Sequence, residues 1–336
     1  MTNIKDIFDK NAKDIPDKPL LGTREKHVQD GTGAVVHGEY KWKTFSQVHK
    51  EATSIARYLM QHDLCPKQTN EEGSFRFVSI YAKNREEWVV SDLGAMMAAI
   101  TTVTLYDTLG QDSIEYILDQ TNMKTVICSS DKIKNLTQLK ASGKLASVTH
   151  IIYYDDAKAE DLEAGSASGF NVKAYTEVLK EAADLADNSS TWDQVTKDTV
   201  YTFSYTSGTT GVPKGVVLTH HNFTANVGAL DALQDEGKFT DSDTVISYLP
   251  LAHVFERLIM VSSVAVGVQI GFYAGDVLKL TQDLAVLKPT IMISVPRLFN
   301  RFYDLMQAKI RELQGIKRQL TEWGIQKKLA AVSSSA

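Results

Sequence analysis

The chain has 336 residues, 43% of them apolar, which is enough for a large core in two or three domains or lobes. Its formal net charge is −5, so no global basic character indicates a nucleic-acid partner. Its two cysteines lie far apart without metal-type spacing, which fits a reducing compartment. The first 18 residues contain four aspartates and no apolar core, unlike a secretory signal.

The first half of the chain predicts an α/β lobe. Residues 1–43 are expected to be a loop-rich segment, and a first lobe is expected over 44–190. Strands are expected at 75–82, 101–106, 125–129 and 148–154, with helices between them. Asn84 to Glu87 has the pattern of a helix N-terminal cap. Strands that alternate with helices predict βαβ units and a mostly parallel sheet.

A polar segment at 187–198 predicts the boundary to a second lobe, 191–336. Strands are expected there at 199–205, 244–249, 268–273 and 290–295. The uncharged run 258–275 changes pattern near Gly267, which favours a buried helix and strand over a membrane span. The last forty residues read as one long amphipathic helix. Its basic residues are more typical of a solvated face than of a membrane- or coenzyme A-binding patch.

One stretch carries the chemistry. Residues 205–215 read Tyr-Thr-Ser-Gly-Thr-Thr-Gly-Val-Pro-Lys-Gly, between two β-rich runs. Glycines let the backbone approach a ligand closely, and successive N–H groups in such a loop form an anion-binding concavity. The hydroxyls add donors or metal ligands, and Lys214 supplies a mobile charge suited to phosphate. The loop predicts a polyphosphate site.

This loop differs from the common nucleotide-binding P-loop, in which Gly-Lys-Ser/Thr opens a helix. Here Lys214 precedes its glycine, a proline precedes the lysine, and a strand follows. The alternatives are a hairpin that binds no ligand and a surface carboxylate as the partner of Lys214. The unbroken run that ends in Pro-Lys-Gly favours phosphate binding.

Residues 206–215 resemble the signature loop of the adenylate-forming (AMP-binding) superfamily. Four further stretches resemble its eukaryotic-type long-chain fatty-acid–CoA ligases: Leu-Gly-Thr-Arg at 21–24, Tyr-Asp-Thr-Leu-Gly at 106–110, Tyr-Leu-Pro-Leu-Ala-His-Val-Phe-Glu-Arg at 248–257 and Ser-Val-Pro-Arg-Leu-Phe at 294–299. The likeness runs from about residue 20 to the last residues. It implies stacked, mostly parallel sheets flanked by helices, the N-terminal large domain of the adenylate-forming fold, incomplete at its C-terminus.

The resemblance implies activation of a long-chain fatty acid with ATP, Mg²⁺ and coenzyme A. The carboxylate attacks the α-phosphorus to give acyl-adenylate and pyrophosphate, and the CoA thiol then displaces AMP. By position in the motif, Thr206 would contact Mg²⁺ or phosphate, and Lys214 would clamp the β- and γ-phosphates. The pyrophosphate cradle would consist of Ser207, Gly208, Thr209, Thr210 and Gly211.

A second group of candidates follows the 248–252 motif. His253 comes after an expected strand, where open α/β sheets bind their ligands. In the resembling families this histidine lies near the acyl carboxylate, so a catalytic role is expected for His253. An isolated histidine is more often structural. Glu256 and Arg257, one helical turn on, are further candidates for substrate contact.

Members of the resembling family are about twice this length. Their adenine-binding Tyr-Gly-x-Thr-Glu stretch and mobile C-terminal domain have no counterpart here, so we expect an N-terminal portion that does not turn over alone. A ligase for medium-chain or aryl acids and a non-catalytic ATP- or acyl-binding fragment are the alternatives. We expect a cytoplasmic protein that can rest on the endoplasmic reticulum or another organelle membrane. The acyl chain length and the oligomeric state stay open.

Overall fold

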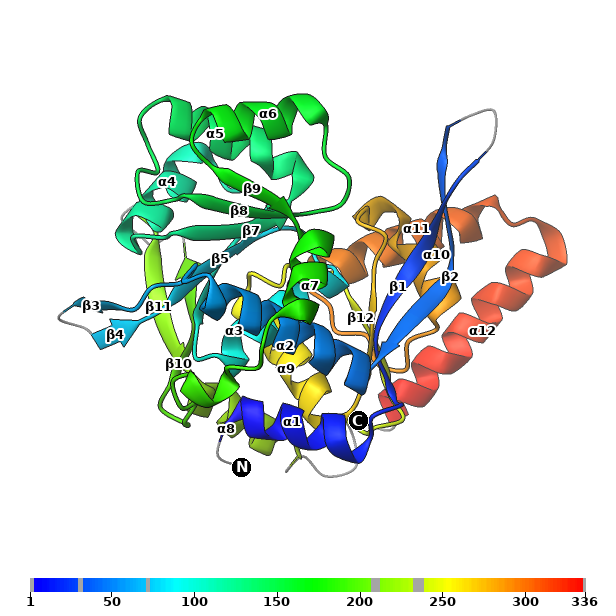
Figure 1. The fold of residues 1–336 in the computed structure, drawn as a ribbon. Helices are drawn as coiled ribbons and strands as arrows, with labels where there is room; N and C mark the ends of the chain where they lie inside the picture. The colour runs from blue at the N-terminus through cyan, green and yellow to red at the C-terminus, as the bar shows by residue number, and fades with distance from the viewer. Residues whose placement is uncertain (1–2, 30–32, 71–72, 207–211, 232–238, 335–336) are drawn as a thin grey trace. The chain divides into compact units, whose positions relative to one another are not determined.

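The computed structural model describes residues 3–29, 33–70, 73–206, 212–231 and 239–334. The chain divides into two compact units, Met1–Ile291 and Met292–Ala336. The predicted α/β class with stacked, mostly parallel sheets is confirmed, and both sheets lie in the first unit (Figure 1).

A seven-stranded sheet has the order β11-β10-β6-β5-β7-β8-β9. Every neighbouring pair is parallel except β10 with β11. The strands are β5 (Phe77–Tyr81), β6 (Thr101–Leu105), β7 (Thr125–Ser129), β8 (His150–Tyr154), β9 (Asn171–Ala174), β10 (Val200–Thr206) and β11 (Lys214–Thr219). The helices between them are α3 (Glu86–Met97), α4 (Gln111–Gln120), α5 (Ile133–Ala141), α6 (Ala159–Ala167) and α7 (Tyr175–Asp184). A short hairpin, β3 (Gln68–Asn70) and β4 (Gly73–Phe75), precedes β5.

Both faces of the sheet are buried at β5 and β6, and the alternation of side chains along β6 decides what each face contacts. Val103 and Leu105 belong to an apolar cluster that includes side chains of α4 and α5. Thr102 points to the opposite face, because successive residues of a strand alternate. There its hydroxyl donates to Asp92 of α3 at 2.9 Å. One face therefore packs mainly against apolar side chains, and the other carries a buried polar network.

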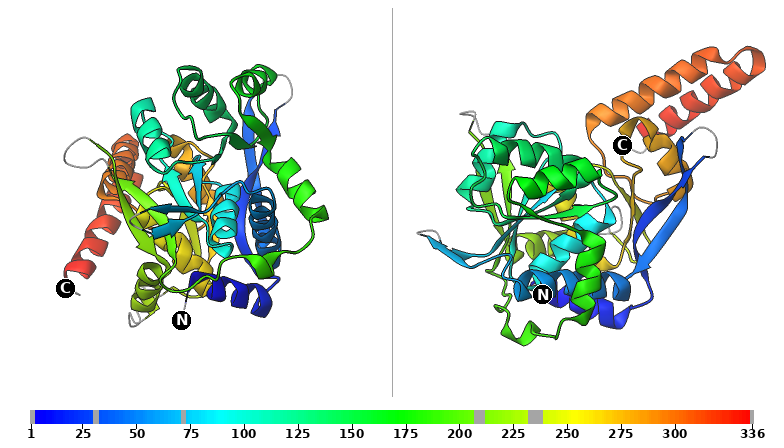
Figure 2. Two further views of the ribbon diagram at one scale, coloured as in Figure 1. Left: turned by 60° about the vertical axis from the view of Figure 1, so that its left-hand side comes forward. Right: turned by 45° about the horizontal axis from the view of Figure 1, so that its top comes forward.

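A four-stranded sheet joins the two ends of the first unit. Its order is β12-β13-β1-β2, from strands β12 (Thr244–Ser247), β13 (Gln269–Phe272), β1 (Pro19–Val28) and β2 (Val35–Thr44). The pair β1–β13 is parallel, and β1–β2 forms an antiparallel hairpin. Figure 2 shows this hairpin from two further sides.

The expectation of a loop-rich segment over 1–43 is wrong. Besides β1 and β2, this segment contains α1 (Ile4–Asp14). Asn3 caps α1 by accepting from the Asp6 backbone N–H, and Ile4, Ile7 and Phe8 are buried at helical spacing. The helix is short and rich in charge, and its apolar stripe consists of only these three residues. After it, α2 (Phe45–Gln61) begins with the predicted capping box of Thr44 and Gln47.

The predicted segment limits can now be placed on the elements. The limit at 43/44 falls at the end of β2, and β2 pairs with β1. The limit at 190/191 falls between α7 and β10, yet β10 pairs with β6 in the same sheet as β5 to β9. The predicted first and second lobes therefore share the seven-stranded sheet.

Three local expectations over 84–295 can also be compared with the structure. The uncharged run forms α9 (Val254–Val266) and β13, and Gly267 ends the helix with φ 94°, as the pattern change predicted. The strand expected at 290–295 is wrong, since only one bridge, Val245 to Ile291, forms there. The cap expected at Asn84 is also wrong: Arg85 is the N-cap of α3 and makes no side-chain cap hydrogen bond.

The remaining helices are α8 (His220–Asp231) and α10 (Leu280–Leu287) in the first unit, and α11 (Pro296–Glu312) and α12 (Gly315–Ser334) in the second. The single long helix expected at the end is thus two helices. Leu313 is extended and Gly315 has φ 59°, which interrupts the helical path. Within the described ranges, no helix has both the length and the apolarity needed to cross a membrane.

Candidate functional site

Three parallel strands, β5, β6 and β10, end at the same edge of the seven-stranded sheet, where open α/β sheets bind ligands. Thr202 pairs with Thr102 and Phe203 with Val103, and Thr206 ends β10 three residues further on. A cavity of about 30 Å³ lies where segments after β5, β6, β12 and β13 meet. Its lining includes Asn84, Tyr106, Asp107, Leu251, Ala252 and Tyr273. The carboxyl ends of both sheets therefore converge on one place.

The structure places two of the predicted loop residues opposite each other. Thr206 ends β10, Lys214 begins β11, and the two are paired across the antiparallel ladder. Side chains of directly opposed residues project from the same face of a sheet. Both residues are exposed, and Lys214 has no carboxylate within ion-pair distance among the described residues. The predicted cradle residues Ser207, Gly208, Thr209, Thr210 and Gly211 lie outside the described residues, and their role stays a prediction.

Packing against a neighbouring ring explains why position 215, next to Lys214, is a glycine. A Cβ at this position would lie 3.0 Å from the Tyr205 ring, which is its cross-strand partner. The Tyr205 hydroxyl donates to Gln120 of α4 at 2.7 Å. The glycine thus leaves room for a ring that anchors the base of the hairpin to the neighbouring helix.

His253 is the N-cap of α9. Its Nδ1 accepts from the Phe255 backbone N–H at 3.1 Å, so a neutral ring in this arrangement carries its proton on Nε2. The side chain is exposed. The carbonyl of the preceding Ala252 accepts from Thr104 of β6 at 3.4 Å, which ties the turn to the sheet edge that also bears Thr206.

Glu256 is 4% exposed and lies one turn into α9. Its Oε1 accepts from the Ser247 hydroxyl at 2.6 Å. Burial raises the pKa of Glu256 to about 8, and the hydrogen bond from Ser247 lowers it only in part. The side chain is therefore predominantly protonated at neutral pH.

Arg257 is buried in a polar network on the inner face of the sheet. Its Nη2 donates to Asp92 at 2.7 Å and to Thr102 at 3.0 Å, and its Nη1 donates to Thr202 of β10 at 3.3 Å. The guanidinium also lies over the rings of Trp88 and Tyr201, at 5.0 and 4.9 Å from their centroids. In the structure both Glu256 and Arg257 bind protein groups. The substrate role expected for them stays a prediction.

Asp92 is the member of this network that the sequence reasoning missed. It lies in α3, among residues that are buried from Trp88 to Met97. A lone acidic residue inside an apolar helix needs a partner when it is buried, and that was the available signal. Its Oδ2 accepts from Tyr201, and burial raises its pKa despite Arg257 beside it.

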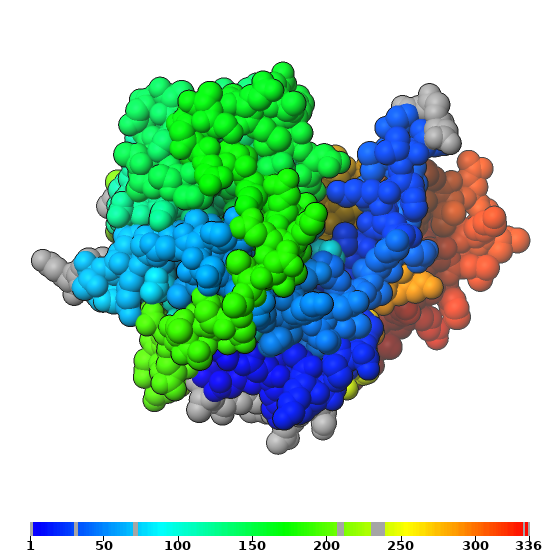
Figure 3. All heavy atoms as spheres, viewed as in Figure 1, coloured from blue at the N-terminus to red at the C-terminus, as the bar shows by residue number. Residues whose placement is uncertain are grey.

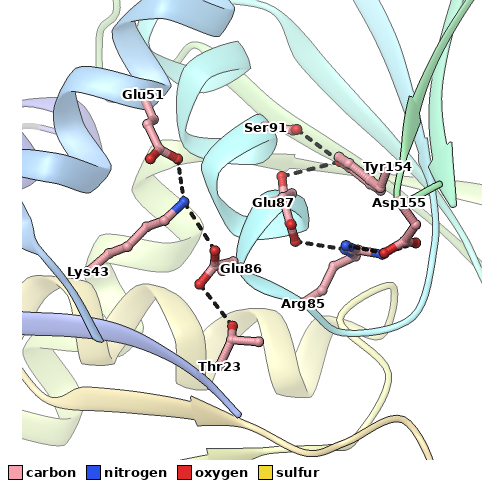
Figure 4. Close-up of polar contacts among 9 residues, drawn as sticks. All are labelled: Thr23, Lys43, Glu51, Arg85, Glu86, Glu87, Ser91, Tyr154 and Asp155. Atoms are coloured by element: carbon pink, nitrogen blue, oxygen red, sulfur yellow. Dashed lines mark hydrogen bonds and ion pairs between the residues drawn. The ribbon is translucent and has the colours of Figure 1, made fainter. Parts of the chain in front are cut away.

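A larger cleft of about 900 Å³ separates the two sheets of the first unit on the face drawn in Figure 3, where it is the hollow between the blue hairpin and the green segment. The start of α3 ties its sides together (Figure 4). Glu86 accepts from Thr23 of β1 at 2.8 Å, and Arg85 pairs with Asp155 beyond β8 at 2.5 Å. These contacts connect both sheets to the start of one helix.

The described residues contain no group of three or more His, Cys, Asp or Glu side chains arranged to hold a metal ion. The oxygen donor that the structure offers beside Lys214 is the exposed Thr206 hydroxyl. This is compatible with Mg²⁺, which is usually bound by one or two protein groups together with substrate phosphates.

A model of the AMP-binding enzyme family matches residues 8–328. The long chain acyl-CoA synthetase 6, peroxisomal, of Arabidopsis thaliana is 35% identical over 320 residues, which cover 95% of this chain and 42% of that protein. The long-chain-fatty-acid–CoA ligase 5 of Rattus norvegicus is 34% identical over 305 residues, 90% of this chain and 42% of that protein. The chain thus spans less than half the length of these relatives.

Solved structures share the fold at lower identity. The A-PCP didomain of carboxylic acid reductase from Segniliparus rugosus, in complex with AMP, has a TM-score of 0.78 at 20% identity and covers 96% of this chain and 47% of its own. The N-terminal domain of FACL13 from Mycobacterium tuberculosis has a TM-score of 0.64 at 19% identity, with 89% and 64% covered.

Proposed function

Because the chain belongs to the AMP-binding enzyme family, we propose that it is the phosphate-binding portion of a long-chain fatty-acid–CoA ligase. The observation that carries this proposal is the pairing of Thr206 with Lys214 across the base of the signature loop. The sequence relatives named as long-chain acyl-CoA synthetases support the choice of acid.

The proposed reaction has two steps. A carboxylate oxygen of the fatty acid bonds to the α-phosphorus of ATP, and the bond from that phosphorus to pyrophosphate breaks. The sulfur of coenzyme A then attacks the acyl carbon of the adenylate, AMP leaves with the bonding electron pair, and the thiol proton is released. The first step concentrates charge on phosphate oxygens, so electrostatic stabilisation is the main task of the protein.

Each exposed candidate has a role in that step. Lys214 would neutralise the β- and γ-phosphates, and the Thr206 hydroxyl would hold Mg²⁺ or a phosphate oxygen. Bound Mg²⁺ would supply further charge neutralisation at the phosphates. His253 would lie near the acyl carboxylate, and its Nε2–H would donate to an oxygen there. Glu256 and Arg257 would act through the position of α9.

The cellular setting is part of the proposal. We place the protein in the cytoplasm, with peripheral contact to an organelle membrane that supplies its fatty acid. Some relatives, such as the Arabidopsis synthetase above, are named peroxisomal. Fractionation of source cells, with a salt wash of the membrane fraction, distinguishes peripheral association from a freely soluble protein.

Binding of Mg·ATP to the Lys214→Ala variant tests the loop assignment. Loss of a hydrogen bond from a charged donor costs about 1.5–3 kcal/mol, so the Kd should rise about 10- to 150-fold. Lys50→Ala is the matched control, since Lys50 is exposed on α2, away from the loop in sequence, and should leave the Kd unchanged. Calorimetry measures both, and equal Kd values for wild type and Lys214→Ala would contradict the assignment.

The substrate class is tested in the whole protein by competition among palmitate, hexanoate and benzoate for acyl-CoA formation. A preference for palmitate is expected. A preference for hexanoate or benzoate would replace the long-chain assignment by a medium-chain or aryl-acid ligase.

A further inference from the structure

Asn84 lies between β5 and α3 and is 8% exposed, although it does not cap the helix that follows. Its amide group instead binds a segment far along the chain. The Nδ2 group donates to the Leu249 carbonyl at 2.6 Å, and Oδ1 accepts from the Leu251 N–H at 2.9 Å. Asn84 therefore closes both sides of the turn around Pro250.

This turn leads directly to His253. The His253 N–H donates to the Pro250 carbonyl at 2.8 Å, so the turn held by Asn84 determines where α9 begins. An asparagine amide suits the task, because it offers a donor and an acceptor side by side. Buried backbone groups need such partners, and a helix or sheet cannot supply them at this turn.

The same amide also contacts the other end of the segment. Nδ2 donates to the Ser247 hydroxyl at 2.9 Å, and that hydroxyl donates to Glu256 at 2.6 Å. Ser247 ends β12 and Glu256 lies in the first turn of α9, and both are buried. One side chain is thus connected to the segment before, within and after the turn that bears His253.

We propose that Asn84 is a positioning residue that sets the location of the His253 ring for the reaction. It does so through the Leu249 and Leu251 backbone and does not itself contact substrate. The expected effect of Asn84 on the reaction rate rests on the proposed function. The expected effect of Asn84 on the position of the His253 ring does not.

The test compares Asn84→Ala and Asn84→Asp with Asn11→Ala. Asn11 donates from Nδ2 to Val264 at 2.8 Å and to Ala265 at 2.9 Å, so it binds the opposite end of the same helix. Its loss removes two side-chain hydrogen bonds to α9 and none to the turn around Pro250. Asn84→Asp keeps the acceptor for Leu251 but loses the donor for Leu249.

The first readout is the ring spectrum of His253 by ¹H–¹⁵N NMR, assigned with a His253→Gln variant among the eight histidines. The His253 resonances should move in both Asn84 variants, more in Asn84→Ala, and stay in place in Asn11→Ala. Exchange of the Leu251 amide should accelerate in Asn84→Ala only. An unchanged His253 spectrum in Asn84→Ala would overturn the proposal, whatever the stability of the variant.

The second readout is fatty-acid-dependent ATP–pyrophosphate exchange in the whole protein. A displaced ring should lower kcat about ten- to a hundredfold in Asn84→Ala, with little change in the KM for ATP. A displaced ring with unchanged kcat would overturn the role of Asn84 in the reaction. If the wild type shows no exchange, the proposed function fails, and the NMR comparison still decides whether Asn84 positions His253.

Discussion

Replacing Asp92 with asparagine should destabilise the first unit by about 3–5 kcal/mol, since it leaves the buried Arg257 without its counter-ion. The side chains of Arg257 and Asp92 are 2% and 0% exposed. A guanidinium does not lose its proton in a protein, so Arg257 stays charged after the change. For unit charges about 4 Å apart at an effective dielectric constant of about 20, the lost attraction is about 4 kcal/mol, the same size as this cost.

The reverse change, Arg257→Met, should cost less, about 1–3 kcal/mol. Asp92 keeps hydrogen bonds from Tyr201 and Thr102, and it can take up a proton because burial already raises its pKa. A raised pKa in the folded state means that stability falls as pH rises above the ordinary aspartate value. Removing Arg257 raises the folded-state pKa of Asp92 further and so widens the pH interval over which stability falls. The cost of Arg257→Met should therefore be larger at pH 8 than at pH 5.

Urea unfolding of both single variants and the double variant measures these costs. The double variant should be more stable than the sum of the singles predicts, by about 2–3 kcal/mol, because it leaves no buried charge unpaired. Costs that add within about 0.5 kcal/mol would refute the pairing. So would an Asp92→Asn variant that is less damaging than Arg257→Met.

Two further predictions concern α9 and the contact of α2 with α3. Glu256→Gln should stabilise the protein increasingly from pH 4.5 to about 8. Over this pH range the free energy of unfolding of the wild type, but not of the variant, falls by up to about 1.4 kcal/mol per pH unit, because the raised pKa of Glu256 favours the protonated folded state. A stability difference in urea that is equal at pH 5 and pH 8 would contradict this. Gly94→Ala should lower the free energy of unfolding by about 1–3 kcal/mol, since its Cβ would lie 2.6 Å from the Ala52 carbonyl oxygen. Gly228→Ala in α8 is the control, because a Cβ there meets nothing within 4 Å. Equal changes in melting temperature for the two variants would exclude the clash.

Much of the first unit could be predicted from local pattern. The strands β5 to β8 and the change from helix to strand at Gly267 follow from apolar periodicity and a glycine, which are properties of neighbouring residues. α1 was not predicted, because only three of its side chains are buried and all of the others except Ala12 are polar or charged. The strand expected at 290–295 is reduced to one bridge between Ile291 and Val245 of β12, because β-branched residues alone do not extend a ladder along a neighbouring strand.

The candidate site shows the same division. The motif at 206–215 identifies Thr206 and Lys214, and the β10–β11 register then places them face to face. The spacing of Glu256 and Arg257 after His253 predicted a shared site, yet their side chains enter the protein interior while His253 stays exposed. A helix carries consecutive residues to different faces, and only the packing around α9 decides which face meets solvent.

The sequence by itself determined the family, the signature loop and the alternation of strands and helices, because each depends on residues close together in the chain. The tertiary structure decided that β1 joins β13, that β10 joins β6, and that Asn84 binds the turn before His253. These pairings depend on which buried polar groups and strand edges meet after the chain has folded. No local pattern encodes the partner of a buried amide or guanidinium, so such partners become visible only when the elements are packed together.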